Sequence, residues 1–91
     1  VGVGHFLLET IMAKVKMNAD KLPFEGGEVL DTEPVQVTNP FSGESIMLTP
    51  LEVTVYDITM GAERFGDYRT VQTGVEWFRR FNPKAYMVLL D

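Results

Sequence analysis

The stretch Leu48-Thr49-Pro50-Leu51-Glu52 decides the fold, because it carries the strongest helix start in the chain. The Thr49 hydroxyl can accept a hydrogen bond from the backbone amide three residues on, while the Glu52 carboxylate reaches back to the Thr49 amide. Pro50 suits the first helical position, where its missing N–H removes no hydrogen bond. Apolar residues also alternate here as in a strand, but the proline-led cap favours a helix.

The helix that starts at Pro50 continues as an amphipathic stripe. Its apolar residues recur every three or four positions, as on the buried face of a helix; they are Leu51, Val55, Ile58, Ala62 and Phe65. Gly61 weakens the middle by about 1 kcal/mol relative to alanine, and Gly66 suits the left-handed conformation that ends many helices. The sequence therefore predicts a helix over residues 50–65.

Two β-compatible segments precede this helix. Residues 34–38 alternate apolar and polar side chains, and residues 45–49 are rich in apolar side chains that strands favour. Between them lie Asn39, Pro40 and Gly43. Asparagine bonds its own backbone, proline presets φ and glycine adopts positive φ, so these three residues indicate a turn. The pattern predicts a β-hairpin.

A second helix is predicted directly after Gly66. Asp67 can cap it, and a wide apolar face follows at helical spacing; this face consists of Tyr68, Val71, Gly74, Val75, Trp77 and Phe78. Asn82-Pro83 ends the helix, since the residue before a proline avoids the α region. The two helices are expected to form an αα-hairpin. Residues 84–90 can form a strand or a short helix capped by Asn82, and the cap favours a helix.

The N-terminal segment carries weaker signals. Residues 9–18 fit both a helical stripe and a strand alternation, and their helix-forming side chains favour a helix. The chain does not begin with methionine, and Met12 is a candidate start. Residues 1–11 are therefore interpreted as a non-native or disordered extension.

A long loop is predicted between this segment and the hairpin. Residues 19–32 contain Pro23, the Gly26-Gly27 pair and scattered acids, which break any regular period. A connection of this length is unusual without structure of its own, so a short strand around Val29 and Leu30 is an open alternative.

Length and composition fit a single domain spanning residues 1–91. The chain has 91 residues, of which 45% are hydrophobic, an ordinary fraction for a globular domain. The predicted elements give an α+β fold, a β-hairpin packed against two to four short helices. No apolar run reaches the roughly 18–20 residues that span a bilayer, and residues 1–8 lack the basic start and cleavage site of a signal peptide. We therefore expect no membrane association and no secretion by a signal peptide.

Charge is unevenly distributed over a chain of net charge −5. The segment from Lys21 to Asp57 has one base against seven acids: Glu25, Glu28, Asp31, Glu33, Glu44, Glu52 and Asp57. The segment from Arg64 to Lys84 has five bases against two acids, the bases being Arg64, Arg69, Arg79, Arg80 and Lys84. Such asymmetry is compatible with self-association or with an ionic partner. The alternative is two ordinary solvated surfaces.

Signals for catalysis are weak throughout. The chain has no cysteine and a single histidine, His5, so a thiolate metal site and a histidine cluster are excluded within one chain. The acids of the loop, Glu25, Glu28 and Asp31, lack the spacing of a calcium-binding EF-hand and are interpreted as solvated. The glycine-rich stretches match neither the G-x-G-x-x-G motif nor the P-loop, the two motifs that bind phosphate groups. We therefore expect no enzyme, no catalytic residues, no cofactor and no metal.

The run Trp77-Phe78-Arg79-Arg80-Phe81 combines aromatic and basic side chains. Such a combination can contact a protein or stack on nucleic acid bases. The candidate contact surface consists of Arg69, Trp77, Arg79, Arg80 and Lys84. The alternative is that Trp77 and Phe78 belong to the core, with the arginines on the wet face of the same helix.

Several strings also resemble a known group of proteins. They are Asn39-Pro40-Phe41-Ser42-Gly43-Glu44-Ser45, Leu48-Thr49-Pro50, Tyr56-Asp57, Met60-Gly61-Ala62, Gly66-Asp67-Tyr68 and Asn82-Pro83-Lys84-Ala85-Tyr86-Met87-Val88-Leu89-Leu90-Asp91. Their pattern resembles a family of small, uncharacterised proteins of marine tailed bacteriophages, cyanophage-like in character, over a little more than half of the chain. The resemblance implies a viral or marine metagenomic origin, with a location in the host cytoplasm or the virion. It carries no functional residues.

Two non-enzymatic functions are therefore considered, and a carboxylate- or metal-dependent enzyme is ranked below both. The leading hypothesis is a non-enzymatic phage accessory or structural protein that acts through protein–protein contacts, with another protein or with itself as a homo-oligomer. The alternative, ranked below it, is a nucleic-acid-binding module that uses the arginine and tryptophan face of the helix after Asp67.

Overall fold

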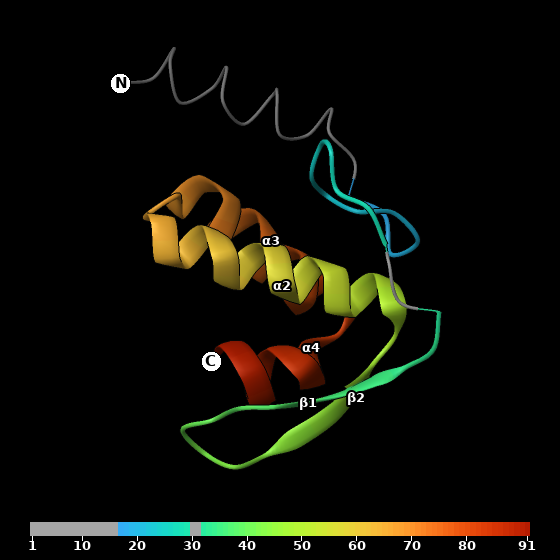
Figure 1. Cartoon of the computed structure of the whole chain (residues 1–91), viewed down its shortest axis with the longest axis vertical. Coiled ribbons are helices and arrows are strands. Elements are labelled where there is room, and N and C mark those ends of the chain that lie inside the picture. The colour runs from blue at the N-terminus through green and yellow to red at the C-terminus, as the bar shows by residue number, and fades with distance from the viewer. Residues whose placement is uncertain (1–16, 30–31) are drawn as a thin grey trace.

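The computed structural model describes residues 17–29 and 32–91. Within them the chain forms an antiparallel hairpin followed by helices, which confirms the predicted α+β class. The elements are β1 (Val35–Thr38), β2 (Ser45–Leu48), α2 (Pro50–Phe65), α3 (Tyr68–Phe81), α4 (Pro83–Ala85) and the π-helical turn η1 (Tyr86–Leu90). Helices α2 and α3 lie side by side, and α4 with η1 fills the space between this pair and the hairpin (Figure 1).

The hairpin forms where the turn residues predict it. The Asn39 side chain accepts a hydrogen bond from the Phe41 amide at 2.9 Å, and Gly43 has a φ of 78°. Val35 pairs with Leu48 and Val37 with Ile46, so these four side chains share the face that packs on the helices. Each strand is one residue shorter than predicted, because Pro34 and Thr49 lie outside the ladder.

Helix α2 begins and ends as the sequence predicts. The Glu52 amide donates to the Thr49 hydroxyl at 3.3 Å, and the Thr49 amide donates to Glu52 Oε1 at 2.8 Å. Gly66 ends the helix with a φ of 73°, a conformation in which a side chain is strained. The Asp67 carboxylate then accepts from the Thr70 amide, which caps α3.

Helices α2 and α3 approach closely at Thr59 and Gly74. A Cβ built on Gly74 would overlap Thr59 Oγ1 and would lie 2.9 Å from the Thr59 Cβ. The Thr59 hydroxyl donates to the Val55 carbonyl at 2.7 Å, so this buried polar group is satisfied within its own helix. The two small residues therefore set how near the two helices can lie.

The core gathers side chains from every element around α3. Its buried members are Leu48, Val53, Val55, Trp77, Phe78, Ala85 and Leu89. Phe78 is fully buried, which confirms its predicted place, and the Trp77 ring meets it edge to face with 5.2 Å between centroids.

The predicted buried faces of the two helices are wrong at two residues. Phe65 is 91% exposed and Tyr68 is 70% exposed. Both lie at the corner between α2 and α3, where the helical spacing continues past the last residues that the other helix covers. Helical periodicity identifies the face of a residue but does not show where its partner helix stops.

The C-terminal turn is tied to the rest of the fold by two asparagines. Asn82 Nδ2 donates to Glu52 Oε2 at 2.8 Å, and its Oδ1 accepts from the Ala85 amide at 3.1 Å. Asn39 Nδ2 donates to the Val88 carbonyl at 3.0 Å, which joins the hairpin turn to η1. The predicted C-terminal helix is thus confirmed, with a π-helical second half.

The described part of the N-terminal loop packs on the helix pair. Trp77 Nε1 donates to the Asn18 carbonyl at 3.1 Å, and Gly27 lies against Leu22 and Ile58. Residues 17–29 contain no helix or strand, so Val29 is not in a strand. The predicted helix over residues 9–18 lies outside the described residues except for its last two, which are not helical, and the extension 1–11 lies wholly outside them.

Candidate functional site

The basic residues predicted as a contact surface separate into two groups. Arg79 and Arg80 end α3 and Lys84 lies in α4, so these three exposed residues share one end of the helical layer. Arg69 lies in the first turn of α3, roughly 16 Å from Arg80 along an axis that rises about 1.5 Å per residue. We call Arg79, Arg80 and Lys84, with Tyr86 beside them, the basic end.

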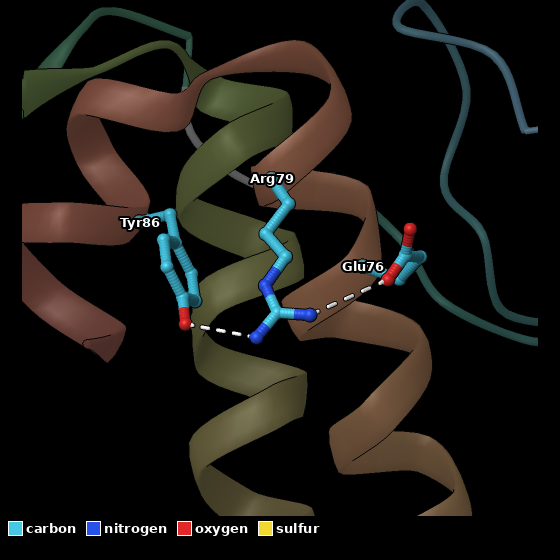
Figure 2. A network of polar contacts seen from close by, with 3 residues as sticks. All are labelled: Glu76, Arg79 and Tyr86. Atoms are coloured by element: carbon cyan, nitrogen blue, oxygen red, sulfur yellow. Dashed lines mark hydrogen bonds and ion pairs between the residues drawn. The ribbon is translucent and has the colours of Figure 1, made fainter.

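Arg79 is held in place by two neighbours (Figure 2). One of its terminal nitrogens donates to the Tyr86 hydroxyl at 3.0 Å, and its guanidinium carbon lies 4.9 Å from the centre of the Tyr86 ring. The other terminal nitrogen lies 3.8 Å from Glu76 Oε2. The hydrogen bond to Tyr86, followed by weaker effects that include the charge of Glu76, raises the pKa of Arg79. The guanidinium is therefore charged and oriented while it stays open to solvent.

Trp77 does not belong to the accessible part of this surface. Only 1% of its area is exposed, because its ring packs against Phe78 and Phe81 and its Nε1 is bonded to Asn18. Trp77 and Phe78 both lie in the core, which is the alternative given above for these two residues. Trp77 therefore cannot contact a partner as part of the accessible surface. Trp77 lies two residues before the exposed Arg79, and because successive helical residues are rotated by about 100°, the two side chains point to nearly opposite sides of α3.

Sequence reasoning missed Tyr86 and Glu76 as partners of Arg79. The pair Glu76 and Arg80 is spaced for an ion pair, yet the ion pair in the structure joins Glu76 to Arg79. Tyr86 follows Arg79 by seven residues across the break at Pro83, so no single helical period relates the two. The sequence did contain one weak signal for this contact, a tyrosine shortly after the Asn-Pro pair that ends the helix.

The acidic loop forms a separate open groove against α2. Its volume is about 530 Å³, and its lining includes the half-buried Phe24 and Ile58 and the exposed Glu25 and Glu28. We call this feature the loop groove. Among residues 17–29 and 32–91, no group of three or more acidic or histidine side chains is placed to hold a metal ion.

No helix in the described part of the chain combines the length and apolar character that crossing a bilayer requires. Comparisons with protein-family models, with curated proteins and with solved structures found no match to this chain. The bacteriophage resemblance therefore stays an expectation.

Proposed function

We propose that this chain is a non-enzymatic accessory or structural protein that binds an acidic protein surface through its basic end. The observation that carries the proposal is the restrained Arg79 side chain. A guanidinium presents a planar set of donors that matches a carboxylate. Because Tyr86 and Glu76 already restrain this one, it loses less conformational freedom when a partner binds.

The neighbouring charges support an acidic partner. Within the described residues, the side chains of Arg80 and Lys84 form no ion pair, so both are available to an incoming carboxylate. Charges at the rim of an interface raise the association rate and make binding dependent on salt. The proposed contact is therefore electrostatically steered, and it weakens as salt is added.

Nucleic acid is a less suitable ligand for the same surface. Proteins that bind single strands combine cations with accessible aromatic rings on which bases stack. Trp77, the aromatic residue proposed for that purpose, is buried, and the chain carries a net charge of −5.

The test compares two labelled ligands of equal charge, a poly-glutamate peptide and a single-stranded DNA, by fluorescence anisotropy. The wild type should bind the peptide better than the DNA, and Arg80→Glu/Lys84→Glu should weaken peptide binding by at least about tenfold. The matched control, Arg64→Glu/Arg69→Glu, makes the same charge change at the corner between α2 and α3 and should bind like the wild type. Preference for DNA, no peptide binding, or equal loss in both variants would refute the proposal.

A further inference from the structure

We infer that the acidic surface bound by the basic end is the loop groove of a second copy of this chain, so that copies associate head to tail. This inference rests on the proposed function and names its partner. It arises from two surfaces of one chain that have opposite charge, one of which is a groove.

The loop groove has the features that an arginine or lysine side chain requires. Phe24 and Ile58 provide an apolar floor on which the aliphatic part of such a side chain can lie, while the charged group stays near water. Glu25 and Glu28 place carboxylates at the rim, within the same lining.

Gly27 brings the loop close to α2 beside this groove. A Cβ there would lie 3.1 Å from the Ile58 Cδ1 and 2.8 Å from the Leu22 Cδ1. Because glycine has no side chain, the loop can lie directly against α2 at this point. The floor and the acidic rim are thus parts of one packed structure and not two segments that happen to be near each other.

Within residues 17–29 and 32–91, no ion pair joins the basic end to Glu25 or Glu28, whereas Arg79 pairs with Glu76. In this part of the chain, the carboxylates of Glu25 and Glu28 and the side chains of Arg80 and Lys84 are therefore open to another copy. The contact uses a different patch on each partner, so it is heterologous and leads to rings or open chains instead of a closed two-fold dimer.

Sedimentation velocity of the full chain tests the inference, over a range of concentrations at low salt and at about 1 M ionic strength, where the Debye length is about 3 Å. The wild type should associate at low salt and dissociate at high salt. Reversing either surface should weaken self-association by at least about tenfold. The two variants are Glu25→Lys/Glu28→Lys for the groove and Arg80→Glu/Lys84→Glu for the basic end.

An equimolar mixture of these two variants provides the decisive result. Each variant alone presents like charges at both surfaces, but in the mixture a contact between the two different variants again joins opposite charges, so association should return. Glu44→Lys/Glu63→Lys and Arg64→Glu/Arg69→Glu are the charge-matched controls, and they should associate like the wild type.

The inference is overturned if the wild type is monomeric throughout, if the mixture does not associate, or if the controls weaken as much as the test variants. Its failure can be told apart from that of the proposed function by the poly-glutamate assay. A monomeric chain that still binds the peptide through Arg80 and Lys84 keeps its acidic partner but excludes a second copy. A chain that binds no acidic peptide loses the proposed function itself.

Discussion

Replacing Gly74 with alanine should destabilise the protein, although alanine is the better helix former. The new Cβ would overlap Thr59 Oγ1 and would lie 2.9 Å from the Thr59 Cβ and 3.1 Å from its Cγ2. Rotation of the Thr59 side chain moves Oγ1 and Cγ2 but leaves its Cβ in place. Because both residues are buried, the overlap is relieved only if α2 and α3 move apart.

The size of the effect follows from two opposing contributions. Overpacking a tight contact costs about 1–3 kcal/mol, and the upper half of that range applies because an immobile Cβ is involved. The higher helix propensity of alanine returns about 1 kcal/mol. We expect a net loss of about 1–2 kcal/mol, and in a domain of this size each 1 kcal/mol lowers the melting temperature by roughly 4–8 °C.

Urea denaturation followed by circular dichroism measures the change in free energy of unfolding. Gly61→Ala is the matched control, since among the described residues its added Cβ meets no atom within 4 Å outside its chain neighbours and the backbone of its own helix, and it should stabilise α2 by about 0.5–1 kcal/mol. Adding Thr59→Ala to Gly74→Ala should recover part of the loss, as expected for residues in contact. A Gly74→Ala protein at least as stable as the wild type would show that the helices do not meet as described.

Three other substitutions test separate contacts. Asn39→Ala removes both the hydrogen bond to the Val88 carbonyl and the acceptor of the Phe41 amide, so it should cost at least about 1 kcal/mol, with faster hydrogen exchange in η1. Hydrogen bonds from Thr70 lower the pKa of Asp67 below its ordinary 3.8, so this contribution to stability is present above pH 3.8 and is lost as pH falls through the folded-state pKa. Acid unfolding of Asp67→Ala should therefore show a smaller loss of stability than acid unfolding of the wild type. Burial, and then the charges of Asp57 and Glu63, raises the pKa of Tyr56 above 10.0. The contribution of Tyr56 to folding stability is therefore present below pH 10.0 and is lost as pH rises through the folded-state pKa. Tyr56→Phe should lose less stability in alkali, and an unchanged alkaline profile would contradict the assignment.

The sequence predicted the elements well where residues a few positions apart form a cap or a turn. Thr49 with Glu52, and Asn39 with Gly43, define their structures through contacts within a few positions, and all of them form as expected. The close approach of Gly74 to Thr59 was not visible, because it depends on how two helices cross. The sequence showed a glycine on an apolar face, but it did not show which small residue it would meet.

The candidate site was predicted only in part for the same reason. Arg79 and Arg80 lie in the last turn of α3 and Lys84 in the α4 turn that follows it, whereas Arg69 lies at the far end of α3. The Asn82-Pro83 break turns the chain so that Tyr86 reaches Arg79, and helical periodicity does not extend across such a break. Burial of Trp77 also depends on a loop 59 residues earlier in the chain.

A nitrogen-15 NMR titration of the full chain with poly-glutamate tests the central claim most directly, because it reports each residue separately. Binding at the basic end should shift the signals of Arg79, Arg80, Lys84 and Tyr86, while the indole N–H of Trp77 stays unchanged. Shifts centred on the Trp77 indole, or no shifts in the basic end at saturating peptide, would contradict the account.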